Sequence, residues 1–304
     1  MSKIKFGVTI NATPEMLYRS DYDAIKKIAQ ECEQLGYDSI WAMDHLMWGG
    51  FYNEGSVFEA WALLSALAVE TQSIKLGPLV GCNSFRNPTL TAKIAATIDV
   101  ISKGRLIFGY GAGWKMDEYK AYGFPFDDPF TRVKKLREGI TLIKKLWTED
   151  KTSFNGEFYE AKNAICKPKP IQKPHPPIMI GGGGEKYTLK VAAEIGDIWD
   201  RWGASIEEYK RKVSILHEHC DNLGRKRDDI DLSWSGPFLI AKDKLQLNER
   251  NRRYGNGMGI LCTYDNCIKV LQEFINVGCT QFLFVLSGFN DEKETFMEEI
   301  ASSF

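Results

Sequence analysis

Eight short apolar runs, each followed by a longer segment with helical periodicity, constrain the fold of this 304-residue chain more than any other feature. The runs are rich in β-branched and aromatic residues and lie at residues 4–10, 39–44, 74–80, 105–111, 178–182, 197–202, 230–241 and 281–288. Strands that alternate with helices along one chain indicate parallel βα units. Because the runs are apolar throughout, we expect both strand faces to be apolar and helices to cover the outside of the sheet.

Eight such units predict an α/β fold in which residues 1–304 form one domain, a (β/α)₈ TIM barrel. A doubly wound open sheet is the alternative architecture that the same alternation allows. Two segments interrupt the alternation, and we predict them as insertions after the fourth and seventh strands, at about residues 150–177 and 242–262. The first contains a β-hairpin that turns at Asn155–Gly156, followed by a proline-rich extended stretch. The second is basic and contains glycine, and we expect it to be looser.

The charge balance and the cysteines argue against several classes of protein. The chain has 39 Lys and Arg and 40 Asp and Glu, a formal net charge of −1, which leaves no basic surplus for nucleic acid or an anionic membrane. No run of 18 apolar residues predicts a membrane span, and the first ten residues resemble a strand and not a signal peptide, so we expect a cytoplasmic protein. The seven cysteines are scattered without a C-x-x-C pair, so we expect reduced, buried thiols and no metal site.

The carboxyl ends of the predicted strands supply the candidate site residues, because the active sites of TIM barrels lie there. The second strand ends in Asp44 and His45, and the strand ends as a group hold no paired carboxylates, no Ser-His-Asp series and no cluster of metal ligands. Trp48, Trp114 and Trp202 lie near strand ends, where they could form the wall of a pocket for a flat, partly apolar ligand. Each of the three taken alone is better explained as a core aromatic.

Four consecutive glycines follow the fifth strand and precede a helix, namely Gly181, Gly182, Gly183 and Gly184. They leave backbone N–H groups uncovered near the positive end of a helix dipole, a combination that binds phosphate or another anion. The alternative is a tight strand-to-helix turn, for which one or two glycines normally suffice. The run matches neither the P-loop nor the G-x-G-x-x-G pattern, so the nucleotide-binding motifs do not apply.

Two side chains near strand ends have both a structural and a functional interpretation. His45 could be a core histidine with a satisfied ring nitrogen or a proton-handling residue at the catalytic rim. Arg86 could bind an anion or pair with an acid such as Asp99, and we favour the pairing.

An ordered series of segments resembles the luciferase-like monooxygenase superfamily, TIM barrels that bind FMN or the deazaflavin coenzyme F420. The densest segment is residues 84–126, which contains "SFRNPTLTAKIAATIDVISKGRLIFGYGAGW", and the series continues through residues 131–147, 154–164 and 167–200. The form "GAGW" together with "PIMIGGGGEKYTL" is more similar to the deazaflavin-dependent branch than to the flavin monooxygenases.

The resemblance implies roles for named positions. Asp44 and His45 match the pair beside the isoalloxazine or deazaflavin ring, where the histidine often handles protons. Leu79–Val80 matches a bulge with a non-prolyl cis peptide behind the ring, and Cys82 follows that bulge and lines the pocket. The four glycines match the segment that holds the phosphate-bearing tail of the cofactor, in agreement with the anion interpretation. Trp114 and Glu118 match the "GW…E" positions after the fourth strand.

Two positions depart from the pattern of the superfamily. Trp114 stands where members that oxidise sugar phosphates have an acidic proton donor, which argues against a sugar phosphate as substrate. Tyr119 stands where many members have a histidine after the glutamate.

The resemblance therefore predicts an F420-dependent oxidoreductase that transfers a hydride between deazaflavin C5 and a small organic substrate. An FMN-dependent monooxygenase that uses reduced flavin and oxygen is the first alternative, and a flavin-binding protein without turnover is the second. Members of the superfamily are commonly dimers built on helices of the second and third units. The apolar helix predicted over residues 57–71 is consistent with such an interface, so we expect a homodimer.

Overall fold

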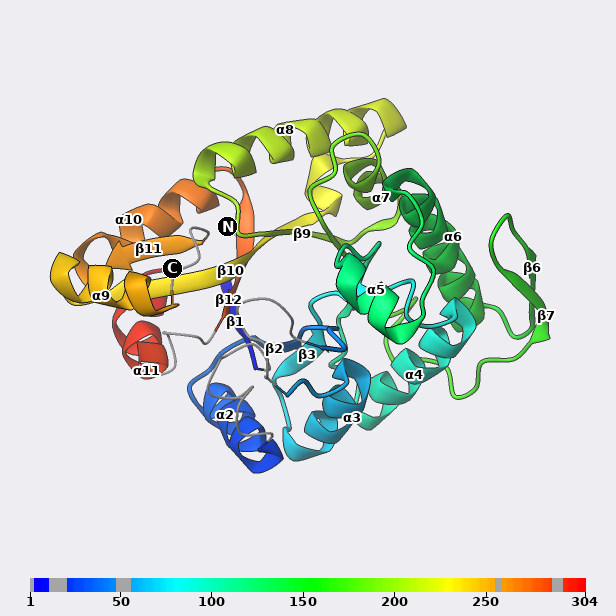
Figure 1. The fold of residues 1–304 in the computed structure, drawn as a ribbon, viewed down its shortest axis with the longest axis horizontal. Coiled ribbons are helices and arrows are strands. Elements are labelled where there is room, and N and C mark those ends of the chain that lie inside the picture. Colours follow the sequence, from blue (N-terminus) through cyan, green and yellow to red (C-terminus); the bar gives the residue numbers. More distant parts are fainter. Residues whose placement is uncertain (1–2, 11–20, 48–55, 255–258, 286–291) are drawn as a thin grey trace.

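Eight parallel strands curve into a barrel, and most of the helices surround it (Figure 1). The computed structural model describes residues 3–10, 21–47, 56–254, 259–285 and 292–304, and all structural statements concern these ranges. The sheet runs in the order β3-β2-β1-β12-β10-β9-β8-β5-β4. Strand β4, the last in this order, continues the chain just beyond β3, the first, so the order closes on itself. A β-bridge between Leu76 and Leu106 also joins β3 directly to the residues just before β5. The predicted TIM barrel is confirmed, and the open sheet is ruled out.

The barrel strands coincide with the eight predicted apolar runs. They are β1 Lys5–Thr9, β2 Ser39–Ala42, β3 Lys75–Pro78 with its continuation β4 Gly81–Cys82, β5 Phe108–Gly111, β8 Ile178–Gly181, β9 Ile198–Trp202, β10 Asp231–Ala241 and β12 Cys279–Val285. The described helices are α2 Tyr22–Gln34, α3 Ala60–Glu70, α4 Pro88–Ile101, α5 Met116–Tyr122, α6 Pro129–Thr148, α7 Thr188–Ile195, α8 Ile206–Leu223, α9 Lys244–Tyr254, α10 Tyr264–Ile275 and α11 Lys293–Thr295. A single-turn 3₁₀ helix covers Arg227–Asp229, and short π and 3₁₀ turns cover Phe296–Ile300 and Ala301–Ser303.

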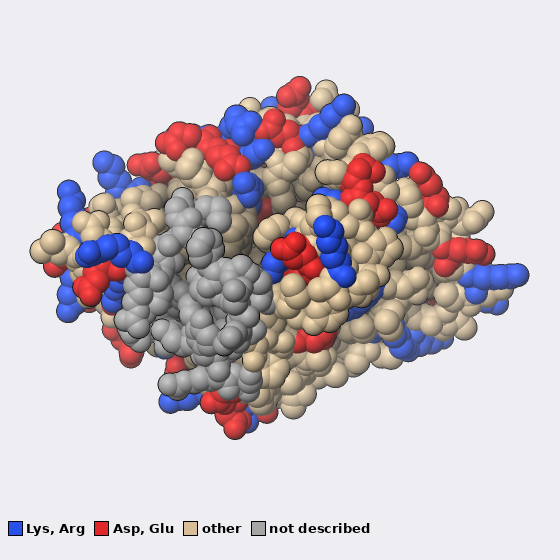
Figure 2. Space-filling view, viewed as in Figure 1, with Lys and Arg blue, Asp and Glu red and all other residues tan. Residues whose placement is uncertain are grey.

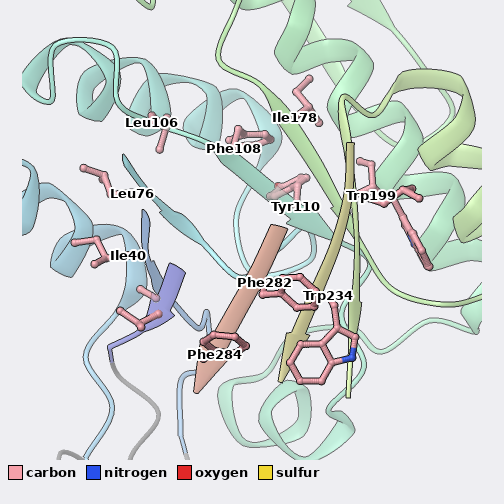
Figure 3. Close-up of a cluster of buried hydrophobic side chains, with 14 of the residues drawn as sticks. Ile40, Leu76, Leu106, Phe108, Tyr110, Ile178, Trp199, Trp234, Phe282 and Phe284 are labelled. Carbon is pink, nitrogen blue, oxygen red and sulfur yellow. The ribbon is translucent and has the colours of Figure 1, made fainter. Parts of the chain in front are cut away.

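The outward faces of the strands form the main hydrophobic core beneath the helices (Figure 3). On β12, the rings of Phe282 and Phe284 are fully buried, and Phe284 packs edge-on against Phe296 at a centroid distance of 5.2 Å. The Trp234 ring on β10 packs against Phe274 of α10 at 5.9 Å. Side chains alternate along a strand, so the residues between these aromatic rings face the inside of the barrel.

The inside of the barrel is less apolar than the sequence predicts. Six strand segments contribute one side chain each to an inner cluster, which consists of Trp41, Leu79, Ile107, Met179, Ile198 and Leu283. Beside this cluster the barrel buries Ser39, Asp200, Ser233 and Ser235, which bond to one another or to Trp41. The expectation of strands that are apolar on both faces is therefore wrong for the inner face. These four polar side chains are stable there because each has a hydrogen-bonding partner.

The two predicted insertions have different structures. The first carries the expected hairpin, β6 Thr152–Asn155 paired with β7 Glu160–Ala164. The second is not loose, because it contains helix α9 and strand β11 Ile260–Thr263, which pairs in parallel with the distal half of β10. Strand β10 is 11 residues long and extends past the barrel, so its free edge supplies the ladder for β11.

All seven cysteines are buried and free, as expected. None of the helices in the described ranges combines the length and the apolar character that crossing a bilayer requires.

Candidate active site

His45 and Glu118 form the central polar pair of the site. His45 lies three residues past the end of β2, and Glu118 lies in α5, which follows β5. The Nδ1 atom of His45 is 3.0 Å from both carboxylate oxygens of Glu118. The imidazole is 15% exposed, whereas the carboxylate is 1% exposed. With an ionised carboxylate as its partner, Nδ1 is the ring nitrogen that carries a proton and donates it to Glu118.

Glu118 is held in its ionised form. Burial would raise the pKa of this carboxyl, but the hydrogen bond and charge of His45, the charge of Lys115 and the Met47 N–H outweigh burial and place its pKa below the ordinary value. The backbone N–H groups of Leu46 and Met47 donate to Glu118 Oε1, each at 3.3 Å, and Lys115 Nζ lies 3.5 Å away. Glu118 therefore binds both the His45 ring and the backbone that follows it.

Asp44, the neighbour of His45, makes a buried ion pair with Arg86. The guanidinium donates to the two carboxylate oxygens at 2.7 and 2.9 Å, and the Cys82 N–H donates to the same carboxylate at 2.8 Å. Arg86 also pairs with Glu59. Because these hydrogen bonds join the end of β2 to the bulge and to the segment that follows it, the geometry assigns Asp44 to positioning the strand ends.

The predicted structural pairing of Arg86 occurs, but with a different acid from the one suggested. Asp99 instead accepts hydrogen bonds from the backbone N–H groups of Ile171 and Gln172, at 2.6 and 3.1 Å. Asp99 thus anchors the proline-rich stretch that follows the hairpin.

The bulge between β3 and β4 projects Val80 against strand ends that lack side chains. The Leu79–Val80 peptide is cis, as the resemblance implies. A Cβ placed on either Gly111 or Gly181 would lie 2.7 Å from Val80 Cγ2, and a Cβ on Gly109 would lie 2.0 Å from the Pro78 carbonyl oxygen. The ends of β5 and β8 therefore need glycine, and Val80, which is partly exposed, has bare backbone on two sides.

The four glycines after β8 have separate structural reasons. Gly181 makes room for Val80, and Gly182 has a φ of +123°, which L side chains rarely adopt. A Cβ on Gly183 would lie 2.7 Å from Arg201 Nε, and one on Gly184 would lie 2.8 Å from Thr188 Oγ1. The requirements of a tight turn thus account for more than one or two of the four glycines.

The glycines do not open the helix directly, since Glu185, Lys186 and Tyr187 separate them from α7. The Gly182 N–H donates to the Asp200 carbonyl at 3.1 Å. The N–H groups of Gly183 and Gly184 have no acceptor within the described ranges. Two amide donors are thus available to an anion, together with the nearby Arg201 guanidinium, which also pairs with Glu208 at 2.7 Å.

The remaining predicted pocket residues lie in different surroundings. Trp114 is 72% exposed and stands edge-on to the His45 ring at a centroid distance of 6.0 Å, so it is a rim residue and not a core aromatic. Trp202 is partly buried and packs against the inner cluster of the barrel. Trp48 lies outside the described residues. Cys82 is buried with Sγ 3.1 Å from the Tyr119 hydroxyl, and burial raises the pKa of its thiol to about 11.

Three features of this site have no counterpart in the sequence prediction. These are the contact between His45 and Glu118, the Lys115 ammonium beside that contact, and the buried carboxylate of Asp200. The signal for the first was present, because both residues follow strands whose carboxyl ends meet at the same mouth.

Asp200 is a buried acid inside the barrel, next to the glycine segment. The hydroxyl groups of Ser233 and Ser235 donate to its two oxygens at 2.9 and 2.7 Å. Burial raises the pKa of Asp200 to about 6, and the two serine hydrogen bonds and the charge of Arg201 offset only part of that effect.

This raised pKa predicts a pH-dependent stability. The folded state binds a proton on Asp200 between pH 4 and 6, where the unfolded chain has largely released it, so this contribution to stability is present at low pH and is lost as the pH rises through 6. Between pH 4 and 7, the free energy of unfolding of the wild type should fall by about 2 kcal/mol relative to that of Asp200→Asn. Urea unfolding at several pH values measures this difference, and parallel pH profiles of the two proteins would contradict the assignment.

The sequence model of the luciferase-like monooxygenase family matches residues 4–276. The chain belongs to this family. The F420-dependent glucose-6-phosphate dehydrogenase of Amycolatopsis mediterranei is 35% identical over 229 residues, which are 74% of this chain and 67% of that enzyme. The FMNH₂-dependent dimethylsulfone monooxygenase of Pseudomonas putida is 31% identical over 223 residues, 73% of this chain and 59% of that enzyme. The matched part thus spans between about three fifths and two thirds of these two relatives.

Solved structures show the same fold over the whole length of the chain. An F420-dependent secondary alcohol dehydrogenase in complex with an F420–acetone adduct superimposes with a TM-score of 0.86 at 21% identity and covers 99% of both chains. The F420-dependent tetrahydromethanopterin reductase of Methanopyrus kandleri superimposes with a TM-score of 0.80 at 22% identity over 100% of both chains. At these identities the likeness concerns the fold.

Proposed function

We propose that this protein is an F420-dependent oxidoreductase that transfers a hydride between deazaflavin C5 and a small organic substrate. The observation that supports it best is the arrangement at the barrel mouth. Val80 stands over bare glycine backbone, and the same rim carries a histidine fixed by a buried carboxylate. Curated relatives at 30% identity or more include F420-dependent enzymes, among them a 5,10-methylenetetrahydromethanopterin reductase of Archaeoglobus fulgidus that is 30% identical over 79% of this chain.

The residues at the mouth fit a planar cofactor with a phosphate tail. A flat ring needs a surface without projecting side chains, which Gly111 and Gly181 provide around Val80. A phosphate needs donors, which the N–H groups of Gly183 and Gly184 and the Arg201 guanidinium can supply. Leu79 packs in the inner cluster of the barrel, and Cys82 packs with Phe85 and Tyr119 just after the bulge.

The bound deazaflavin would supply the hydride chemistry, and the protein would orient the reactants and handle the proton. Nε2 of His45 would take the proton from a substrate hydroxyl during oxidation, or return it to a carbonyl oxygen during reduction. Glu118 would keep Nδ1 protonated and hold the ring in place. Trp114, exposed beside His45, would cover the substrate, which suits a small molecule with an apolar part.

An FMN-dependent monooxygenase is the second candidate, because the dimethylsulfone monooxygenase is 31% identical over 73% of the chain, against 35% over 74% for the F420-dependent glucose-6-phosphate dehydrogenase. FMN would use the same ring surface and ends at a single phosphate. The two candidates differ in which cofactor binds and in whether oxygen is consumed.

Equilibrium titration of the purified apoprotein with the deazaflavin coenzyme and with FMN tests this proposal. We expect tighter binding of the deazaflavin, and we expect Gly181→Val to weaken it at least about 30-fold because the new side chain would displace Val80. Ser214→Val is the control, since it places the same new side chain at an exposed position of α8. A preference for FMN would shift the assignment to the monooxygenase, and failure to bind either cofactor would refute both.

We also propose a homodimer that buries the outer face of α3 and α4. Val69, Leu90 and Ile101 are 66%, 54% and 40% exposed there, a set of large apolar side chains that a lone barrel has no reason to present. Light scattering should give the mass of two chains, and Val69→Glu combined with Leu90→Glu should give the mass of one. A monomeric wild type would contradict this assignment.

A further inference from the structure

The Lys115 ammonium lies beside the contact between His45 and Glu118, and the mechanism proposed above gives it no role. Lys115 is the residue just before α5, and its side chain is 13% exposed. Its Nζ atom donates to the Met47 carbonyl oxygen at 2.9 Å and lies 3.5 Å from Glu118 Oε1. Lysine side chains are rarely this buried without a partner, so these two oxygens account for the position of the ammonium.

The Glu118 carboxylate requires a positive partner, because it is 1% exposed and a buried charge is stable only when it is paired and hydrogen-bonded. Two groups can supply the positive charge, namely the imidazolium form of His45, whose Nδ1 atom is 3.0 Å away, and the ammonium of Lys115. A lysine keeps its charge throughout the neutral pH range, whereas the charge of a histidine depends on the pH. With Lys115 in place, Glu118 therefore stays paired whether or not the imidazole is charged.

Without Lys115, the imidazolium of His45 would be the charge that compensates Glu118. Loss of a proton from the ring would then leave a buried carboxylate without a counter-charge, which is strongly destabilising. The ring would consequently hold its proton up to a higher pH. A general acid or base has to gain and lose its proton in every turnover, so such a histidine would be a poor catalyst near neutral pH.

The other titratable and charged groups around the imidazole come from its own strand end, from β4 and from α5. Within the described ranges, Asp44 is paired with Arg86, which also contacts Glu59. The buried Cys82 and Tyr119 are neutral near pH 7, because burial raises the pKa of both groups. On the face of the molecule in Figure 2, Lys and Arg are interspersed with Asp and Glu, so the surface there imposes no field of one sign. None of these groups changes in the variants described below, so they do not contribute to the expected differences.

We propose that Lys115 is a positioning residue that acts as the permanent counter-ion of Glu118 and thereby allows His45 to gain and lose a proton. The use of that proton in hydride transfer rests on the function proposed above, whereas the charge balance does not. The lysine sets the pH range in which the pair can exchange a proton. Through its hydrogen bond to Met47, it also fixes the backbone that follows the histidine.

NMR titration of the histidine side chains in the apoprotein tests the charge balance without cofactor or substrate. The chain has four histidines, so the absence of one signal in His45→Gln identifies His45, and the other three serve as internal controls. Lys115→Met removes the charge and keeps most of the length of the side chain, so the titration midpoint of His45 should rise by about one pH unit. Lys115→Arg keeps the charge and should leave the midpoint within about 0.3 pH unit of that of the wild type.

Two further variants separate the charge from its surroundings. Lys120→Met is the matched control, because Lys120 is exposed on the same helix and this variant removes the same charge, and we expect it to leave the His45 midpoint unchanged. Lys115→Gln removes the charge but keeps a hydrogen-bond donor, and it should give the same upward shift as Lys115→Met. This second variant provides the test if Lys115→Met does not fold.

The loaded enzyme gives an independent readout in the pH profile of hydride transfer. For oxidation, the acid side of the profile should move to higher pH by about one unit in both Lys115→Met and Lys115→Gln, and Lys115→Arg should keep the wild-type profile. A loss of structure alone would lower the rate at every pH and leave the position of the profile unchanged.

Three outcomes overturn the inference. The first is an unchanged His45 midpoint in both Lys115→Met and Lys115→Gln, and the second is an equal shift in Lys120→Met. The third is a wild-type His45 that stays protonated from about pH 5 to pH 9, since Lys115 would then not allow the proton to leave. The expected shifts in an apoprotein that binds neither cofactor would support the charge balance and refute the proposed function alone.

Discussion

Replacing His45 with alanine is expected to slow hydride transfer by about 10²- to 10⁴-fold, the range that a positioned general acid or base contributes. The Nδ1 atom of His45 lies 3.0 Å from the ionised Glu118 carboxylate, and in the proposed reaction the imidazole exchanges a proton with the substrate. Affinity for the cofactor should change less than about threefold, because Val80 and the glycine backbone stay in place. Anaerobic stopped-flow absorbance of the deazaflavin, with a panel of small alcohols and aldehydes as substrates, measures the rate.

Variants of α5 separate proton handling from loss of structure. Glu118→Gln keeps the shape of the side chain but removes its charge, so the rate should fall by about 10- to 100-fold. Tyr122→Phe is the matched control, because the Tyr122 hydroxyl donates to the Leu46 carbonyl at 2.9 Å and lies outside the pair that His45 forms with Glu118. We expect this variant to turn over at nearly the wild-type rate. Wild-type turnover by His45→Ala would remove the histidine from the mechanism.

The strands of the barrel could be predicted because their signal is local. Each is a short apolar run, and the run that ends at Asp44 marks β2 without reference to any other part of the chain. The order inside the second insertion could not be predicted because it is not local. Strand β11 exists through its pairing with the distal end of β10, and nothing within the basic stretch 242–259 indicates that a free strand edge lies beside it.

For the candidate site, too, the sequence predicts where a residue lies along the chain but not which side chain it contacts. His45 and Glu118 were each placed at a strand end, but they are 73 residues apart, and only closure of the barrel brings their side chains together. The glycine run illustrates the opposite error. The local motif favoured an anion site over a tight turn, whereas Gly181 is small because Val80, more than a hundred residues earlier, lies against it.

Replacing Asp44 with asparagine should lower the free energy of unfolding by about 3 kcal/mol. Removing one partner of a buried ion pair destabilises a protein by about 3–5 kcal/mol, and the contact that Arg86 keeps with Glu59 places this case at the lower end. The carboxamide oxygen of the variant could still accept the Cys82 N–H, but its N–H₂ group would be unable to accept from the guanidinium. Urea unfolding measures the loss.

A surface ion pair of the same type provides the control for this variant. Asp221 and Arg227 are about half exposed and lie 2.6 Å apart, so Asp221→Asn should leave the free energy of unfolding nearly unchanged. Adding Arg86→Met to Asp44→Asn should restore part of the loss, because the double variant no longer buries an uncompensated charge. Equal losses for Asp44→Asn and Asp221→Asn would show that Asp44 does not hold the bulge and the second strand end together. The role of Asp44 beside His45 would then have to be sought in the chemistry.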